Sequence, residues 1–365
     1  MKILIICSSL IPCGGTEKAI SNMSKIFSQM ENINTTIISI SSKDNEVPAF
    51  EMSSPIIHMG MDPLSYSQFG KIKWYLKVIP SLARLVKKLN PDIILSVGHN
   101  ISFMMPFISK RRIVYACEHI DFTTIPKISK LLIKIAYSKL SGIIVLSETA
   151  KRKIKSINKN IMVIPNSISI KSLHPLLRND IFQLIMVGRI SQEKGFERII
   201  PIAKELKRHT QNFCINIYGD GPMRNEVENL IDLNKLSDVV HMNGYEKNIA
   251  QKYEENSILL LTSYTEALPM VIIEANSFGL PVIAYDNEGV QELVIDGQNG
   301  YSINSDDVKT FVDKILYLIN DMDKLNAMRN SSYEISKLYS EEKIAIKWSK
   351  LLNGITVQNK DYYNI

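Results

Sequence analysis

The chain has 365 residues, of which 45% are hydrophobic and 22% are charged, and its formal net charge is +6. This is a globular composition, and the length excludes one typical domain and fits two of roughly 150–200 residues. No apolar run approaches the roughly 18 residues of a membrane-spanning helix. The four cysteines lack metal-ligand spacing, which indicates buried, reduced thiols in the cytoplasm: Cys7, Cys13, Cys117 and Cys214.

The positive charge is concentrated in the first half of the chain. Residues 1–170 contain 22 Lys and Arg against 10 Asp and Glu, a balance of +12, and residues 71–159 contain 18 against 4. Such a segment is either a set of solvated helix faces or a surface for anionic lipid or a phosphate-bearing acceptor, and we prefer the membrane surface. Nucleic acid is disfavoured, because basic and aromatic residues are not interleaved and no known binding module is present.

The first half of the chain alternates short β-branched runs with runs of helical period. Residues 2–8 are predicted as a strand rather than a signal peptide, because the apolar run is short and ends in a Gly-Gly turn. Further strands are predicted at 34–40, 55–59, 92–97, 112–118, 142–147 and 161–165, and helices at 17–30, 75–89 and 128–140.

The second half repeats the alternation after a polar, proline-containing join at 166–180. Apolar strands that alternate with helices predict parallel sheets covered on both faces. We therefore expect an N-terminal α/β domain at 1–168 and a second at 169–340. Strands are predicted at 182–188, 213–219, 239–244, 257–263, 280–285 and 300–304, and helices at 196–209, 224–234, 269–278 and 341–355.

Candidate ligand-binding residues follow the strands, where open parallel sheets bind their ligands. In VGRISQEKG a strand ends at Gly188, and one loop then carries Arg189 and Lys194. Their two cations suit a single anion such as a diphosphate, although loop cations are as often simply solvated. In YGDGP, Gly219 and Gly221 permit close approach of a nucleotide or form an ordinary tight turn.

The stretch TEALPMVIIEA follows the next strand. Pro269 suits a first helical position, so that the amides of Met270 and Val271 point from the positive helix end toward a phosphate. Glu266 precedes this helix and Glu274 lies about one turn inside it. The two carboxylates therefore serve different sides of a bound ligand.

Two strand ends in the first half carry further candidates. After the first strand, Gly14 and Gly15 allow close backbone approach, and Thr16 is expected to cap the helix that carries Glu17. The strand at 112–118 ends in Glu118 and His119. A lone histidine is often structural, but its place at a strand end favours a functional role.

Together these segments resemble retaining glycosyltransferases of the GT-B class, family 4 (glycosyl transferases group 1). The match covers nearly the whole chain, through GGTE, EHI, IIVLSE, VIPNSI, VGRISQEKG, YGDGP, EALPMVIIEA and GLPVIAYDNEGVQELVIDGQNGY, and is most specific over 184–300. It implies two Rossmann-like domains whose parallel sheets face a central cleft. The first binds the acceptor, the second binds the nucleotide sugar, and a C-terminal helix at 341–365 crosses back to the N-terminal domain.

The resemblance also implies residue roles. Glu274 would bind the ribose hydroxyls and Glu266 the donor-sugar hydroxyls, while Arg189 and Lys194 would neutralise the diphosphate. His119 would contact the sugar, and it is with Glu266 a catalytic candidate. The departing phosphate is then stabilised by fixed protein charge, so no metal or other cofactor is expected.

Three local features qualify this assignment. The pattern Asp321-Met322-Asp323 binds metal in another transferase class, but here it lies between helical segments, away from the strand ends. Ala267 stands where the family commonly has Gly, which either narrows the sugar site or shows that this loop needs no positive φ. Ile120 stands where many relatives are polar.

The implied activity is that of a hexosyltransferase in O-antigen, capsule or exopolysaccharide synthesis. The donor would be a hexose or N-acetylhexosamine linked to UDP in preference to GDP, and the acceptor a lipid-linked saccharide. The enzyme would be a cytoplasmic protein, peripheral on the inner face of the membrane.

Four other functions fit parts of this sequence less well. A glycosidase would use Glu266 and Glu274 as acid and nucleophile, but it leaves Arg189 and Lys194 unexplained. A nicotinamide-dependent oxidoreductase lacks its G-x-G-x-x-G turn. A nucleotide-sugar epimerase of similar architecture is disfavoured by the basic first half. A non-catalytic nucleotide-sugar sensor would not need Glu266, which this chain retains.

Overall fold

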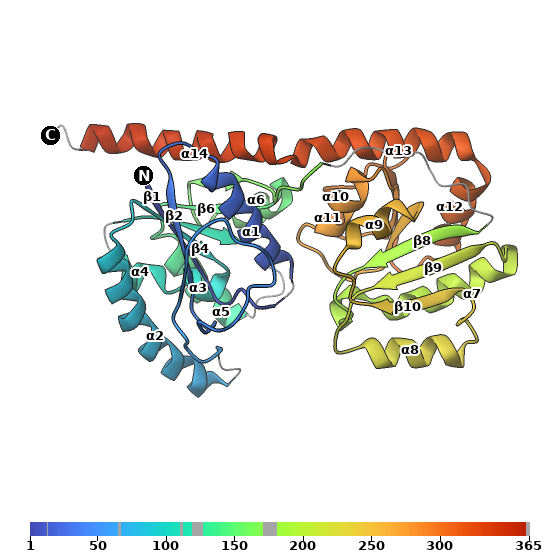
Figure 1. The fold of residues 1–365 in the computed structure, drawn as a ribbon, viewed down its shortest axis with the longest axis horizontal. Coiled ribbons are helices and arrows are strands. Elements are labelled where there is room, and N and C mark those ends of the chain that lie inside the picture. The colour runs from blue at the N-terminus through green and yellow to red at the C-terminus, as the bar shows by residue number, and fades with distance from the viewer. Residues whose placement is uncertain (13, 65–66, 110–111, 119–126, 171–180, 363–365) are drawn as a thin grey trace. The chain divides into compact units, whose positions relative to one another are not determined.

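The computed structural model of the chain describes every residue except 13, 65–66, 110–111, 119–126, 171–180 and 363–365 (Figure 1). The chain forms two compact units, Met1–Ser167 together with Glu341–Ile365, and Ile168–Ser340. Each unit contains one β-sheet in which every pair of neighbouring strands is parallel, as the sequence predicts. Within the described part of the chain, none of the helices has both the length and the apolarity needed to cross a bilayer.

The sheet of the first unit has seven strands in the order β3-β2-β1-β4-β5-β6-β7. The order reverses between β1 and β4, which is the topological switch of a doubly wound fold. The strands are β1 Lys2–Cys7, β2 Asn34–Ser39, β3 Ile56–His58, β4 Ile93–Val97, β5 Ile113–Glu118, β6 Gly142–Val145 and β7 Ile161–Val163. The helices are α1 Gly15–Ser28, α2 Gln68–Leu89, α3 His99–Ser102, α4 Met105–Ile108, α5 Lys127–Tyr137, α6 Glu148–Ile154 and α14 Glu341–Tyr362.

Each face of this sheet is covered by a different helical layer. One core cluster joins the strands to buried side chains of α2 and α5, among them Trp74, Val78 and Tyr137. The other joins the strands to α1 and α14, and there the Phe27 ring meets Trp348 edge-on at 5.1 Å between ring centroids. The C-terminal helix is thus part of the first unit's core. An ion pair of 2.8 Å between Lys25 and Glu341 fixes its start.

The sheet of the second unit has six strands in the order β10-β9-β8-β11-β12-β13, with its switch between β8 and β11. The strands are β8 Phe182–Val187, β9 Phe213–Tyr218, β10 Val240–Gly244, β11 Ile258–Leu261, β12 Val282–Tyr285 and β13 Gly300–Ile303. The α-helices are α7 Ile199–His209, α8 Arg224–Leu233, α9 Ile249–Glu254, α10 Met270–Ser277, α11 Glu288–Gln291, α12 Val308–Asn320 and α13 Met322–Ser336. Short 3₁₀ turns are η2 Gln192–Lys194, η3 Phe196–Arg198 and η4 Lys337–Tyr339.

Several of the observed helices differ from the predicted ones. Helix α2 begins at Gln68 rather than residue 75, because the Ser67 hydroxyl accepts a hydrogen bond from the Gly70 amide at 3.0 Å and caps the helix there. Helix α1 begins at Gly15 with Gly14 as its N-cap, so Thr16 lies in the first turn and does not cap it. Short helices such as α3, α4 and α6 span too few turns for their period to be read from the sequence.

Candidate functional site

Loops that follow strands of the second sheet pack against one another at its carboxyl edge. A Cβ on Gly219 would lie 1.8 Å from the Gly188 carbonyl oxygen, and one on Gly221 would lie 2.3 Å from that of Ile190. The Ile190 amide also donates to the Asp220 carbonyl at 2.9 Å. The loops after β8 and β9 are therefore in backbone contact, and only glycine fits at these positions.

An ion pair joins the loop after β8 to the loop after β11. The Lys194 ammonium lies 2.7 and 2.9 Å from the two Glu266 carboxylate oxygens, and the Ser263 hydroxyl donates to the same carboxylate at 2.8 Å. Glu266 is only 9% exposed. Gly195 makes this approach possible: it adopts φ 58°, and a Cβ there would lie 2.6 Å from the Thr262 carbonyl oxygen.

Arg189 and Lys194 have different surroundings. Arg189 is exposed and lines an open pocket of about 550 Å³ together with Gln192, Glu193, Pro222 and Met223, whereas Lys194 is turned to Glu266. Both cations act on Glu193: its burial opposes ionisation, but the Ser191 hydroxyl and the charges of Lys194 and Arg189 together lower its pKa. Both cations thus act on one carboxylate of the protein, and their joint binding of a diphosphate stays a prediction.

Helix α10 carries the second carboxylate. The helix begins at Met270, and Pro269 is its N-cap with ψ 105° rather than the first helical residue. No side chain caps this end, so the amides of Met270 and Val271 lack partners within the helix and present its positive end. Glu274 lies one turn further on and accepts a hydrogen bond from the Tyr253 hydroxyl at 3.2 Å. Glu266 and Glu274 are thus held by separate contacts.

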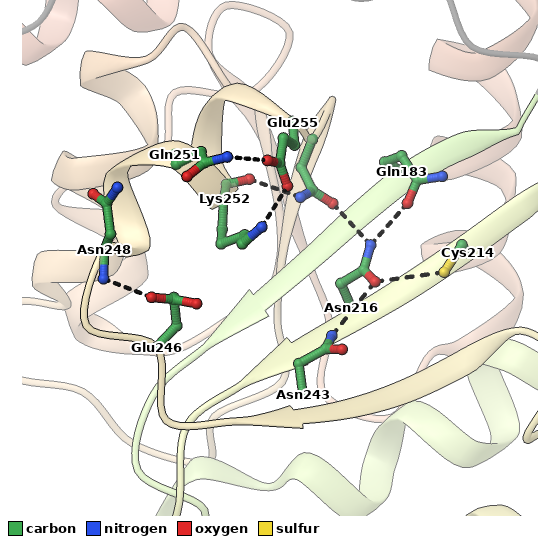
Figure 2. A network of polar contacts seen from close by, with 10 residues as sticks. Gln183, Cys214, Asn216, Asn243, Glu246, Asn248, Gln251, Lys252 and Glu255 are labelled. Carbon is green, nitrogen blue, oxygen red and sulfur yellow. Dashed lines mark hydrogen bonds and ion pairs between the residues drawn. The ribbon is translucent and has the colours of Figure 1, made fainter.

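A polar network positions the helix that carries Tyr253. Figure 2 shows Asn216 of β9 at its centre, where the side-chain amide donates to Gln183 at 2.9 Å and to Asn256 at 3.3 Å. The Asn256 amide in turn donates to the Lys252 carbonyl of α9 at 2.7 Å. Tyr253 is 1% exposed and stacks on Phe278. The network therefore fixes the hydroxyl that contacts Glu274.

Arg198 is a site-forming residue that the sequence analysis missed. Its guanidinium is buried, donates to the Thr262 carbonyl at 2.8 Å and pairs with Asp306 at 2.9 Å. It also lies over the rings of Tyr264 and Tyr285, at 4.5 and 3.9 Å from their centroids. These contacts hold the strand end from which Glu266 follows. Nothing in the local pattern distinguishes Arg198 from a solvated helix position.

The structure describes two of the three local features that qualify the family resemblance, Ala267 and Asp321. Ala267 is not among the described residues with positive φ, so this loop does not require glycine there. Asp321 is the N-cap of α13, where its carboxylate accepts from the Lys324 amide at 2.8 Å. That contact gives Asp321 a structural role at a helix start.

The first-unit candidates lie at the carboxyl ends of β1 and β5. Gly14 caps α1, Gly15 begins it, and a Cβ on Gly14 would lie 2.7 Å from a Glu17 carboxylate oxygen. The Glu17 carboxylate therefore folds back over the helix start. Burial raises the pKa of Glu17, while backbone hydrogen bonds from Glu17 and Gly14 oppose the rise.

Glu118 is not an open site residue but a buried one, 3% exposed. One carboxyl oxygen, Oε1, accepts hydrogen bonds from the hydroxyls of Tyr137 and, at 3.3 Å, Ser102. Burial raises the pKa of Glu118 to about 8, against the lowering effect of these two donors. The neighbouring His119 and Ile120, which the sequence also singled out, lie outside the described residues.

Comparison with known proteins finds a family match within the second unit and similar proteins along the whole chain. Residues 174–335 match the family described as glycosyl transferases group 1. The chain is 27% identical over 348 residues to an uncharacterized glycosyltransferase of Haemophilus influenzae, covering 93% of this chain and 96% of the relative. It is 26% identical to the amylovoran biosynthesis glycosyltransferase AmsD of Erwinia amylovora, covering 96% and 99%.

A solved structure shares the architecture of the whole chain. A crystal structure of an S. aureus TarM variant with fondaparinux, α-GlcNAc-glycerol and UDP superposes with a TM-score of 0.79 at 18% identity, covering 96% of this chain and 99% of TarM. Together with the two doubly wound units, this likeness establishes the GT-B fold class.

Proposed function

Since the chain carries a glycosyl transferases group 1 domain and is a glycosyltransferase of polysaccharide biosynthesis, we propose that it transfers a hexose or N-acetylhexosamine from UDP to a lipid-linked saccharide acceptor, with retention of anomeric configuration. The UDP bound in the TarM structure supports the choice of nucleotide. The family match also favours a transferase over the glycosidase, oxidoreductase, epimerase and sensor alternatives.

The contact between Lys194 and Glu266 carries this proposal. It places one cation and one largely buried carboxylate at the carboxyl edge of the second sheet, beside the switch between β8 and β11 where such folds bind nucleotides. Lys194 is suited to a diphosphate oxygen and Glu266 to sugar hydroxyls. Donor binding would then replace each partner of the ion pair by a ligand group.

The proposed reaction breaks the bond between the anomeric carbon and the phosphate oxygen and forms one to the acceptor oxygen. Negative charge develops on the departing diphosphate, where Lys194, Arg189 and the amides of Met270 and Val271 stabilise it. Glu274 is proposed to bind the ribose. The acceptor proton passes to the departing phosphate oxygen, so this scheme routes no step through a cofactor.

A donor screen tests the proposal. UDP-glucose, UDP-N-acetylglucosamine and GDP-mannose are compared by thermal shift, because a ligand that binds only the folded state raises the midpoint. We expect stabilisation by a UDP-sugar, its loss in Lys194→Ala, and its retention in Lys204→Ala, a matched exposed lysine on α7. Stabilisation by GDP-mannose alone, or an unchanged response of Lys194→Ala, would contradict the proposal.

Product analysis tests the acceptor and the stereochemistry. Labelled sugar should enter the lipid fraction of a membrane extract, and the new linkage should keep the anomeric configuration of the donor. Label found only as free sugar would refute the assignment of a lipid-linked acceptor.

A further inference from the structure

Exposed apolar side chains of the first unit gather on three helices. Seven of its nine large exposed hydrophobic residues within the described part lie on α2, α4 and α5, the other two being Val47 and Ile346. They are, with their exposed fractions, Phe69 81%, Ile72 58%, Leu76 70%, Phe107 59%, Leu131 61%, Leu132 48% and Ile135 51%. We call this set the apolar patch.

The geometry of α2 turns its part of the patch away from the core. Trp74, Val78 and Leu82 form the buried stripe of this helix. Phe69, Ile72 and Leu76, spaced by three and four residues, share another face of it. The helix therefore has two apolar stripes, and the protein's own core covers one.

Helices α4 and α5 extend the same surface. The rings of Tyr75, Phe103 and Phe107 follow one another at centroid distances of 5.6 and 6.2 Å, which joins α4 to α2. Helix α5 packs into the same core cluster as α2 through Ile133 and Tyr137, which leaves its exposed leucines on the outside of one helical layer.

The charge on helix α2 has one sign. Helix α2 contains six Lys and Arg and no Asp or Glu. Lys73 and Lys77 alternate with the apolar side chains, and the outer face continues as Arg84, Lys87 and Lys88. Lys77 lies 3.5 Å from the Asp62 carboxylate in an exposed pair, and such pairs contribute little.

We propose that the apolar patch and its basic border dock this protein on an anionic lipid leaflet. Phe69, Ile72 and Leu76 enter the acyl boundary, while the lysines extend to the phosphates. Apolar insertion combined with basic charge is the pairing that anchors interfacial helices stably. A second copy of the chain fits less well, because it would bring a like-charged surface against this one. The inference rests on the proposed function in that a lipid-linked acceptor lies at such a surface.

Vesicle binding tests the inference. The whole protein is sedimented with phosphatidylglycerol–phosphatidylcholine vesicles and with phosphatidylcholine vesicles. We expect binding to the anionic vesicles, and a loss of roughly tenfold or more in the combined variant Phe69→Ser, Ile72→Ser, Leu76→Ser. The variant Lys71→Gln, Lys73→Gln, Lys77→Gln should bind less and show a weaker salt dependence. The control Leu233→Ser, Ile295→Ser, Leu338→Ser removes exposed apolar side chains of the second unit and should bind like the wild type.

Thermal midpoints and donor binding are measured for the same variants, to show that a loss of vesicle binding is not a loss of folding. All three variants alter exposed side chains, so their thermal midpoints and their response to UDP-sugar should match the wild type. Equal vesicle binding by the patch variant, equal binding to neutral vesicles, or a patch that mediates self-association in gel filtration would overturn the inference. A wild-type protein that binds UDP-sugar but not vesicles refutes the docking surface alone, whereas failure to bind any UDP-sugar refutes the proposed function.

Discussion

At the scale of single residues, Lys194 and Glu266 compensate each other. A largely buried carboxylate without a counter-charge is costly, and the ammonium 2.7 Å away meets that requirement before any ligand arrives. The same contact opposes diphosphate binding, because the Lys194 ammonium is already paired with the Glu266 carboxylate. The ion pair that stabilises the site without ligand therefore also lowers the affinity of the site for the donor.

Opposite effects on nucleotide affinity follow for the two members of the pair. Glu266→Gln should bind UDP as tightly as the wild type or up to roughly tenfold more tightly, because Lys194 is released, while turnover falls by about two orders of magnitude. Lys194→Ala should weaken UDP binding by about tenfold or more. Titration calorimetry and steady-state kinetics measure both, and equal losses of UDP affinity in the two variants would contradict this account.

Glu118 predicts a pH dependence of stability. The carboxyl titrates near 4.3 in an unfolded chain and at about 8 in the fold. Between these values the folded protein holds one more proton than the unfolded one, so this group lowers the free energy of unfolding as pH rises, by at most about 1.4 kcal/mol per pH unit. Below the lower pKa the carboxyl is protonated in both states, so the stability contributed by this group is fully present there.

Glu118→Gln mimics the neutral carboxyl and should remove this slope. Urea titrations from pH 5 to pH 9, in the range set by the two pKa values, should show the variant close to the wild type at the acid end and more stable at the alkaline end. Parallel stability curves for the two proteins would show that the carboxylate does not titrate as proposed.

At the scale of elements, the loops after β8 and β9 depend on backbone contact. A Cβ on Gly219 would overlap the Gly188 carbonyl, so the two strand ends must separate to admit it. Gly297 offers a matched control: it also has positive φ, 74°, but nothing lies within 4 Å of its Cβ position.

Gly219→Ala should therefore lower the free energy of unfolding clearly more than Gly297→Ala does. We expect about 1 kcal/mol for the control, from its strained φ alone, and on the order of 3 kcal/mol or more for Gly219→Ala, together with loss of UDP binding. Denaturant titration and calorimetry report the two effects. Similar costs at both positions would show that the loops are not in the close contact described.

At the scale of the whole molecule, the C-terminal helix completes the core of the first unit rather than that of the second. Trp348 is 4% exposed and lies in the core formed with α1. Trp348→Ala should destabilise the first unit by about 3–5 kcal/mol and leave UDP affinity within about twofold of the wild type. Ile346→Ala, at a half-exposed position of the same helix, is the control. Unfolding followed with and without UDP separates the two units, and equal loss of UDP affinity would contradict this division.

The local sequence determined the α/β class and the positions of the strands, although strands such as β7 and β11 end two residues earlier than predicted. Strands buried on both faces need nearly continuous apolar runs, and such runs are visible without any knowledge of contacts. Glycines next to those runs also marked the loops after β8 and β9, because a tight strand-to-helix turn requires them locally.

Only the tertiary structure decided which charges meet. Lys194 and Glu266 are 72 positions apart, and nothing periodic in the sequence pairs Lys194 with Glu266 while leaving Arg189 exposed. The burial of Glu118 by Tyr137 and Ser102, and of Arg198 between two tyrosine rings, likewise depends on side chains from other elements. Periodicity reports which face of an element is buried, whereas the partner of a buried charge is set by the packing of distant segments.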